Sequence, residues 1–329
     1  MNDEEIAQGF RRCIVAAPGC DFVDPDFSAI EAVVTGWLAR DPAYIKLAWA
    51  GVHDYMVGAE LKQVPPTTEL HKYTVAELKA LLKPFKKHPE RNRKKKTVHG
   101  VSYGQTAHGQ HKLYPHLFKS VREAQKELDF FFTLCPSIPP LQKLCRELAH
   151  KRHYLGADVM PGPTGTHPFG FKHWFWHVYG WNTFRQEMGP GQDYNRVVAY
   201  GGQSIGAGII YNALLALHDP GDPDYIGDLD LGHGRGAGKL SFVAENYTTP
   251  FRLLVHDSAL FEILTKLREK LIERVIRVME RPLTMMPCPE EWGLGPYLKV
   301  GVAVKVGKNW GEHSEDNPNG MQEVYSSSL

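Results

Sequence analysis

The sequence contains little cysteine, almost no net charge and no long apolar run. Its five cysteines are an odd number and include no C-x-x-C pair, which argues against a disulfide framework and against a cysteine zinc site. The 38 Lys and Arg residues almost balance the 37 Asp and Glu residues. The molecule as a whole therefore has no strong attraction for nucleic acid, and any site for a polyanion must be local.

Membrane and secretory segments are not expected either. No apolar run approaches the roughly 18 residues that a membrane span needs. The first five residues, Met1–Glu5, are acidic and lack the apolar stretch of a secretory signal. We therefore expect a cytoplasmic protein that makes no membrane contact.

The composition is that of a folded globular protein. Apolar residues make up 43% and charged residues 23% of the 329 residues, and about two domains are expected at this length. Residues 251–255 and 297–306 have the pattern of strands. Apolar residues at helical spacing predict a long amphipathic helix over residues 258–279.

The positive charge that is present is concentrated in residues 83–96, which contain eight Lys or Arg residues and one acid, Glu90. The stretch 90–103 lacks proline and predicts a helix. Four side chains that could bind a nucleotide recur at every fourth position: Arg91, Lys95, His99 and Tyr103. Such spacing places them on one face of a helix. The two cations could bind phosphates, and the two rings could stack on a base or sugar.

The length of this helix supports the same hypothesis. Twelve residues of helix rise about 18 Å, roughly the reach of a nucleoside triphosphate from terminal phosphate to base. The alternative is a solvated run of charge, which Arg93, Lys94 and Lys96 on the other faces leave open.

Two aspartates are predicted to stand at the ends of strands. Asp26 comes between a strand-like segment and a helical pattern over residues 28–39, and Asp257 follows residues 251–255. A carboxylate in that position can bind a hard divalent cation together with a backbone carbonyl. Each aspartate also has an ordinary interpretation, as the start of a helix or as a turn residue.

Together, the two aspartates and the basic helix favour two-metal nucleotidyl transfer. One metal would lower the pKa of an attacking 3′-hydroxyl, and the other would stabilise the departing pyrophosphate. Lys95 would neutralise charge on the triphosphate and protonate the leaving group.

These motifs have a collinear counterpart in family A DNA polymerases, the relatives of bacterial DNA polymerase I, and above all in the bacteriophage branch. Asp26-Phe-Ser-Ala-Ile-Glu31 resembles the family's first palm motif, D-Y-S-Q-I-E. Residues 91–104 resemble the fingers motif R-x3-K-x3-[F/Y]-G-x2-Y-G. Val255-His256-Asp257 resembles the start of the second palm motif, V-H-D-E, and residues 304–310 resemble the final strand.

The resemblance implies an α+β fold, in which helices flank an antiparallel palm sheet and a large, mostly helical fingers domain is inserted. Residues 1–50 would form the first part of the palm and would carry Asp26. Residues 51–191 would form the fingers. Residues 192–329 would form the second part of the palm and would carry Asp257.

The resemblance also implies the catalytic groups. Two Mg²⁺ ions would be held by the carboxylates of Asp26 and Asp257 and by the backbone carbonyl of Phe27. Lys95 would be the catalytic cation of the fingers.

Substrate contacts follow by the same resemblance. Glu31 would lie under the sugar and exclude a 2′-hydroxyl. The groups expected to contact the incoming dNTP are His53, Arg91, His99 and Tyr103. Gln203 and His256 would contact the primer–template DNA.

The sequence departs from the family's pattern at several positions. Residue 99 is His where the motif has Phe or Tyr, Ser258 replaces an acid, and Arg196 stands seven rather than eight residues before Gln203. Only 25 residues precede Asp26. The thumb, an upstream palm segment and a 3′–5′ exonuclease are therefore expected to be absent from this chain.

The function expected is that of the palm and fingers of a template-directed DNA polymerase. A second chain would supply the thumb and the 3′–5′ exonuclease. The alternative is a non-catalytic DNA-binding or assembly subunit of a polymerase complex. A single-subunit RNA polymerase is disfavoured by Glu31. If the protein is viral, its location would be the cytoplasm of the host cell.

Two other motifs are set aside. Residues 232–240 do not have the spacing of a phosphate-binding loop, because His233 and Leu240 stand at positions that require Gly and Ser or Thr. The segment 173–177, His-Trp-Phe-Trp-His, lacks the Glu of a zinc hydrolase. Its aromatic residues are expected to pack within the fingers or to contact the template.

Overall fold

The computed structural model describes residues 3–183, 186–227, 229, 250–255 and 257–327. Two compact units divide the chain. The first takes its described residues from 1–28, 207–281 and 300–328, and the second from 29–206 and 282–299. Each unit is therefore built from segments that lie far apart in the sequence.

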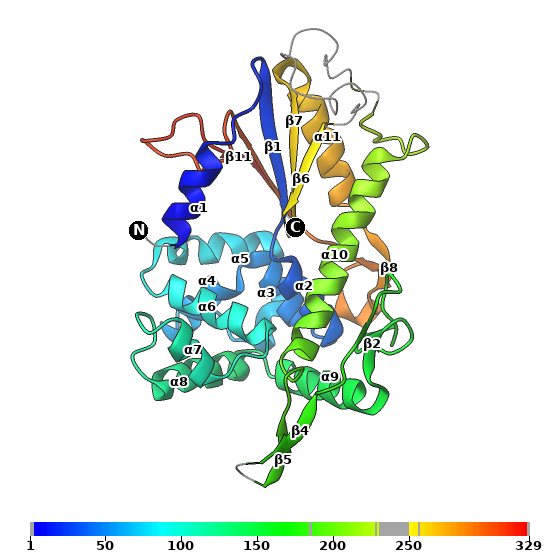
Figure 1. The fold of residues 1–329 in the computed structure, drawn as a ribbon. Coiled ribbons are helices and arrows are strands. Elements are labelled where there is room, and N and C mark those ends of the chain that lie inside the picture. The colour runs from blue at the N-terminus through cyan, green and yellow to red at the C-terminus, as the bar shows by residue number, and fades with distance from the viewer. Residues whose placement is uncertain (1–2, 184–185, 228, 230–249, 256, 328–329) are drawn as a thin grey trace. The chain divides into compact units, whose positions relative to one another are not determined.

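The first unit is organised around a five-stranded sheet with the strand order β11-β10-β1-β7-β6 (Figure 1). Every pair of neighbouring strands is antiparallel. The strands are β1 (Cys20–Phe27), β6 (Phe251–Val255), β7 (Ser258–Leu264), β10 (Val302–Gly307) and β11 (Gln322–Ser326). Among the described residues, the α-helices that lie wholly within this unit are α1 (Asp3–Arg12) and α11 (Arg268–Met279). The antiparallel sheet that the sequence predicted is confirmed.

Helix α11 covers the middle of this sheet and contacts β1, β7 and β10. It buries five apolar residues at helical spacing, Leu271, Ile272, Val275, Val278 and Met279. The opposing sheet residues are also apolar, and Val23, Phe261, Val302 and Val304 are completely buried. This core holds the strands in register at the place where the two predicted metal-binding aspartates stand.

The prediction of one helix over residues 258–279 is wrong in its first third. Residues 258–264 form strand β7, a 3₁₀ turn follows at Thr265–Leu267, and only then does α11 begin. Ala259, Leu260, Phe261 and Ile263 are buried in the sheet. Pairing with β1 and β6, which are remote in sequence, decides the conformation here.

The second unit is mostly helical. Its helices are α2 (Ile30–Leu38), α3 (Pro42–Ala50), α4 (Val52–Glu60), α5 (Val75–Leu82), α6 (Arg91–Ser102), α7 (Ala107–Leu113), α8 (Val121–Leu134) and α9 (Ile138–Arg152). Helix α10 (Arg196–His218) begins in the second unit and ends in the first. The 3₁₀ helices are η1 (Thr67–Lys72), η2 (Lys83–Lys87) and η4 (Glu290–Trp292).

Three short two-stranded sheets complete the second unit. They pair β2 (Tyr154–Gly156) with β3 (Lys172–Trp174), β4 (Tyr179–Asn182) with β5 (Glu187–Pro190), and β8 (Leu283–Pro287) with β9 (Tyr297–Leu298). The predicted strand over 297–306 is thus divided between β9 here and β10 in the first unit.

The predicted α+β class, with a mostly helical region beside an antiparallel sheet, is confirmed. The domain boundaries 1–50, 51–191 and 192–329 stay a prediction. No helix in the described part of the chain has both the length and the apolar character to cross a membrane.

Truncation of Phe261 tests the importance of the sheet core. Its side chain is fully buried, and its ring meets the ring of Phe251 at a centroid distance of 5.9 Å. We expect Phe261→Ala to lower the free energy of unfolding by about 3–5 kcal/mol, because it leaves a cavity. Phe10→Ala is the control, since Phe10 is 67% exposed, and should change stability by less than about 0.5 kcal/mol. Equal effects in urea denaturation would contradict this description of the core.

Candidate active site

The two predicted metal-binding aspartates lie side by side on the sheet of the first unit. Asp26, near the end of β1, pairs in register with Ser258 of β7. Asp257 occupies the turn that joins β6 to β7. The backbone N–H of Phe27 donates to the carbonyl of Asp257 over 3.1 Å. The hairpin therefore brings together two carboxylates that are 231 positions apart in the sequence.

This arrangement raises the pKa of Asp26 to about 7. Burial is the largest cause, and the negative charges of Asp257 and Asp24 add to it. Burial also raises the pKa of Asp24, although the indole N–H of Trp310 donates to its carboxylate over 3.2 Å. The other carboxylate oxygen of Asp24, Oδ1, is buried without a hydrogen-bond partner.

Crowded, poorly solvated carboxylates suit a divalent cation, which would replace their mutual repulsion with attraction. The donor set consists of hard oxygen atoms, the type that Mg²⁺ prefers. Among the described residues, no group of three or more His, Cys, Asp or Glu side chains has a metal-binding arrangement. The fit to a metal therefore rests on the Asp26–Asp257 pair and on the unpartnered oxygen of Asp24.

In the second unit, α2 begins directly after this strand. The chain turns into the helix through Ala29, whose φ of 54° is left-handed, and no side chain caps the helix. Glu31 lies in the first turn, and its carboxylate accepts a hydrogen bond from the hydroxyl of Tyr103 over 3.0 Å. Two predicted nucleotide-binding residues, 72 positions apart, are thereby joined.

The predicted basic helix is observed as α6, which ends one residue before Tyr103. Lys95 and His99 are exposed, whereas Arg91 is half-buried. Arg91 donates to Asp54 Oδ1 over 2.5 Å and to the His53 Nε2 atom over 2.6 Å. The guanidinium group is therefore held in place from α4.

His53 is kept neutral by its surroundings. Burial is the largest cause that lowers the pKa of His53, to about 4. The charge of Asp54 opposes this shift, and the charges of Arg91, Lys95 and His99 reinforce it. Three members of the predicted nucleotide-binding face are thus close enough to His53 to act on its protonation.

The interpretation of the basic segment as a solvated charge run does not hold for its other faces. Lys94 is completely buried, with its Nζ atom 2.6 Å from Glu127 and 2.8 Å from Glu60. Arg93 pairs with Glu123 over 2.9 Å. Lys95, in contrast, forms no ion pair among the described residues. Ion pairs therefore compensate Arg93 and Lys94, whereas Lys95 on the predicted nucleotide-binding face keeps its charge, as does Lys96, which lies over the ring of Tyr114 on another face.

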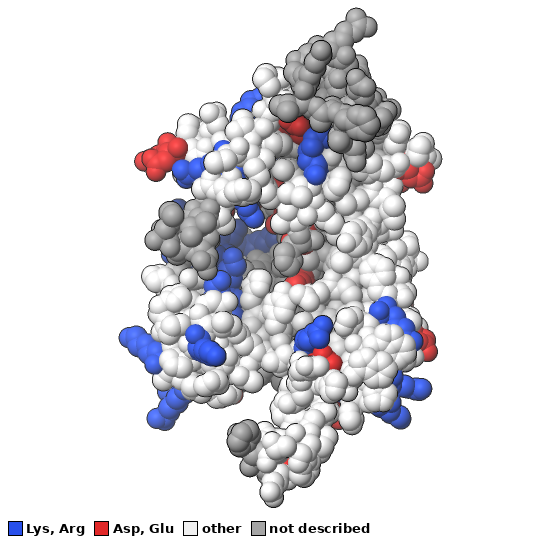
Figure 2. All heavy atoms as spheres, in the orientation of Figure 1, with Lys and Arg blue, Asp and Glu red and all other residues white. Residues whose placement is uncertain are grey.

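The surface charge agrees with such a local site. On the face shown in Figure 2, Lys and Arg side chains form small separate groups among described residues that are mostly uncharged. Attraction for a polyanion would therefore depend on particular side chains and not on a broad basic surface.

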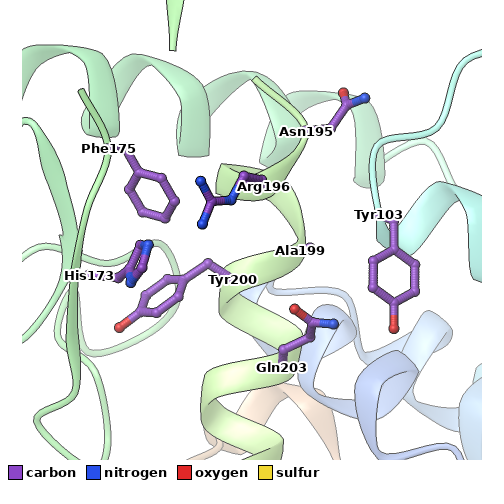
Figure 3. Close-up of a pocket in the computed structure, with 8 residues that line it drawn as sticks. All are labelled: Tyr103, His173, Phe175, Asn195, Arg196, Ala199, Tyr200 and Gln203. Atoms are coloured by element: carbon purple, nitrogen blue, oxygen red, sulfur yellow. The ribbon is translucent and has the colours of Figure 1, made fainter. Parts of the chain in front are cut away.

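A cavity of about 430 Å³ lies between Tyr103 and helix α10 in the second unit (Figure 3). Its lining residues are Tyr103, His173, Phe175, Asn195, Arg196, Ala199, Tyr200 and Gln203. The rings of His173 and Phe175 pack on that of Tyr200, at centroid distances of 5.8 and 5.7 Å. In Figure 3 the amide of Gln203 points toward the side of the cavity on which Tyr103 lies. The cavity thus combines aromatic rings with the polar groups of Asn195, Arg196 and Gln203.

Several residues of these sites were not predicted from the sequence. Arg196 and Tyr200 line the same cavity as Gln203, which was predicted, and stand seven and three residues before it on α10; this helical spacing was the available signal. Asp24 lies two residues before Asp26 and so shares its face of the strand. Asp54, which holds Arg91, carried no signal of its own.

Two predicted features fall outside the described residues. His256, the predicted contact to the primer end, is one of them. The segment 232–240, which was set aside as a phosphate loop, is the other. Phe27 is described and buried, at the end of β1 beside Asp257.

Comparisons with known proteins give a likeness of fold. No protein-family model and no curated protein matches the sequence. A similar solved structure is the POL domain of Pol1 from M. smegmatis, in complex with DNA primer-template and dNTP, with a TM-score of 0.59 and 19% sequence identity. The match covers 94% of this chain but only 43% of that one. The chain therefore has the fold of part of a DNA polymerase I-like domain.

Carboxyl NMR would test the aspartate pair directly. In protein labelled with ¹³C-aspartate and freed of metal, one carboxyl signal should titrate near pH 7 and should be missing from Asp26→Asn. Addition of Mg²⁺ should move its midpoint to lower pH, because a cation stabilises the charged form. NaCl at equal ionic strength is the control and should move it much less. A spectrum in which no aspartate titrates above about pH 5.5 would contradict the crowded arrangement.

Proposed function

We propose that the chain is the palm and fingers portion of a template-directed DNA polymerase, which adds dNTPs to a primer 3′ end by two-metal nucleotidyl transfer. The observation that carries the proposal is the contact between Asp26 and Asp257 on an antiparallel sheet, where the pKa of Asp26 is about 7. The fold shared with a polymerase domain supports it.

Two Mg²⁺ ions would be held by Asp26, Asp257 and the carbonyl of Phe27. When bound, such ions activate the attacking 3′-hydroxyl and stabilise the departing pyrophosphate. The protein's part is to hold the two carboxylates in fixed positions. The pairing of β1 with β7 and the hydrogen bond from Phe27 to Asp257 do this.

Helix α6 would bind the triphosphate. Arg91 is fixed by Asp54 and His53, so that its charge is positioned before the substrate arrives. Lys95 is exposed on the same face of α6, so its ammonium group is accessible to a bound triphosphate. It would neutralise the triphosphate in the transition state and donate a proton to the pyrophosphate oxygen as the P–O bond breaks.

The Glu31–Tyr103 pair would select the sugar. The hydrogen bond between them fixes the carboxylate at one edge of the tyrosine ring. A ribose 2′-hydroxyl at this position would have to displace that bond, whereas a deoxyribose would not. His99, one turn earlier on α6, would abut the same nucleotide.

DNA would be contacted through Gln203 and the cavity beside it, with His256 as the proposed contact to the primer end. The chain corresponds to 43% of its structural neighbour. An enzyme of that kind needs further segments, and we propose that a second chain with a thumb and a 3′–5′ exonuclease supplies them. The motif resemblance supports a bacteriophage protein that works in the host cytoplasm.

A non-catalytic DNA-binding or assembly role is the second candidate. It is favoured by Ser258, which stands where the second palm motif has an acid and whose hydroxyl donates to the carbonyl of Val255 over 3.2 Å. Position 258 therefore lacks a carboxylate that could bind a metal, and its side chain stabilises the turn instead.

Primer extension with Mg²⁺ and dNTPs separates the two roles. We expect Asp257→Asn to abolish incorporation while it changes primer–template affinity less than about twofold, because that carboxylate would serve the metal and not the grip on DNA. The assay is run with and without a thumb-bearing chain. Extension that the Asp257→Asn variant also supports would exclude the proposed role. DNA binding without extension under both conditions would favour the assembly subunit.

Lys95→Ala tests the cation of α6. The single-turnover rate of incorporation should fall by about 10²–10⁴, the usual contribution of a general acid. Lys96→Ala is the matched control, because Lys96 lies over the ring of Tyr114 at 5.0 Å on another face of the helix. Similar losses in the two variants would indicate a general charge effect and would remove Lys95 from the chemical step.

A further inference from the structure

A row of aromatic side chains lies on and beside the β2–β3 hairpin of the second unit. The rings of Trp174 and Trp176 are parallel within 3°, with centroids 5.5 Å apart. His153 stacks on Trp176 at 5.6 Å, and Tyr154 meets Trp174 edge-on at 5.2 Å. We name these four residues the aromatic row. Neither the proposed chemistry nor the cavity beside Gln203 uses them.

The aromatic row is exposed although its backbone is firmly held. Trp174 is 48% and Trp176 63% exposed. Phe175, between them, is buried, because successive side chains point to opposite sides of an extended chain. The backbone N–H of Phe175 donates to the carbonyl of His153 over 2.7 Å, and that of Trp176 donates to Asp193 over 3.1 Å. The rings are thus positioned in advance, and a large part of each tryptophan side chain is open to solvent.

Cations accompany the aromatic row. The Nζ atom of Lys172 lies 3.7 Å from the ring centroid of Tyr154 and 4.3 Å from that of Trp174. Lys151 and Arg152 end α9 directly before His153 and are exposed. An acid is present as well, since Asp158 accepts a hydrogen bond from the hydroxyl of Tyr154 over 3.0 Å. The cations nevertheless outnumber it.

We propose that the aromatic row binds single-stranded DNA, with bases stacked on the tryptophans and phosphates near the cations. Every base has a face that can stack, so a rigid row of rings binds unpaired strands with little sequence preference. Interspersed cations match a polyanion better than they match the apolar surface of a protein partner. The source of the strand rests on the proposed function: it is the unpaired template of a primer–template.

The segment around β3 separates the aromatic row from the cavity. His173 and Phe175 line the cavity beside Gln203, whereas Trp174 and Trp176 belong to the aromatic row. Because successive side chains point to opposite sides of an extended chain, the row and the cavity lie on opposite sides of this segment. A DNA strand bound at the aromatic row would therefore have to pass around the edge of β3 to reach the cavity.

The first experiment measures binding of a fluorescein-labelled 15-mer of thymidylate by anisotropy. The Trp174→Ala, Trp176→Ala double variant should bind about tenfold more weakly or worse, because stacking of two bases is lost. Trp181→Ala is the matched control, since Trp181 is 62% exposed but lies outside the row, on β4, and it should keep the wild-type affinity. Circular dichroism and thermal unfolding establish that each variant is folded.

Conservative variants separate stacking from general apolar contact. The Trp174→Phe, Trp176→Phe double variant should keep most of the wild-type affinity for the 15-mer, whereas the Trp174→Leu, Trp176→Leu double variant should not. Lys172→Ala should reduce the salt dependence of binding by about one phosphate contact. Equal affinity of the alanine variant and the wild type, or no binding by the wild type, would overturn the proposal. If the leucine variant bound DNA as well as the phenylalanine variant, general apolar contact and not stacking would explain the binding. The surface would then fit a protein partner as well as it fits DNA.

The failure of this inference can be told from the failure of the proposed function. The alanine double variant should lose affinity for a primer–template with a 15-nucleotide overhang but not for one with a single-nucleotide overhang. If primer extension occurs but the alanine double variant changes the affinity for both overhangs equally, the proposal for the aromatic row is wrong. The proposed polymerase function would then still stand. If the row binds the 15-mer but no extension is found, DNA binding stands and the polymerase does not.

Discussion

The arrangement of the first unit depends on the proximity of two carboxylates that repel each other. The register of β1 against β7 brings Asp26 to Asp257, and burial together with the neighbouring negative charges makes ionisation of Asp26 costly. The structure opposes this cost with an apolar core, in which α11 covers β1, β7 and β10. The proposed cation site is thus held together by apolar residues that would not themselves contact a cation. The proposed chemistry requires this, because relaxed carboxylates would move apart.

Helix α6 of the second unit also places charged side chains close together. Those on one face are buried in ion pairs, and those on another face are exposed. Lys94 is buried between Glu60 of α4 and Glu127 of α8, so ion pairs fix the helix from behind. Lys95, one residue later, is exposed. One basic segment therefore both attaches the helix to its neighbours, through Lys94, and forms the proposed binding surface, through Lys95.

The sequence alone predicted the structure correctly where the conformation depends on neighbouring residues. It failed where pairing with distant segments determines the conformation. The proline-free stretch 90–103 predicted α6 correctly, because a helix depends on residues close in sequence. The same reasoning gave a helix for 258–264, where pairing with β1 produces a strand. The support of Arg91 by Asp54 could not be found, because nothing in the local sequence marks that contact. The proximity of Asp26 and Asp257 was inferred from motif resemblance, and only the fold shows how it is built.

The neutral state of His53 has a consequence for the position of the positive charge. Burial and the neighbouring cations lower its pKa to about 4, and Arg91 donates to its ring nitrogen. An anion bound at this pair would neutralise the cations and favour the imidazolium form. Burial is the largest cause of the shift and would remain, so the pKa of His53 would rise only in part. A neutral His53 can accept the hydrogen bond from Arg91 and so leaves the positive charge of this pair on the guanidinium group, where an anion would meet it.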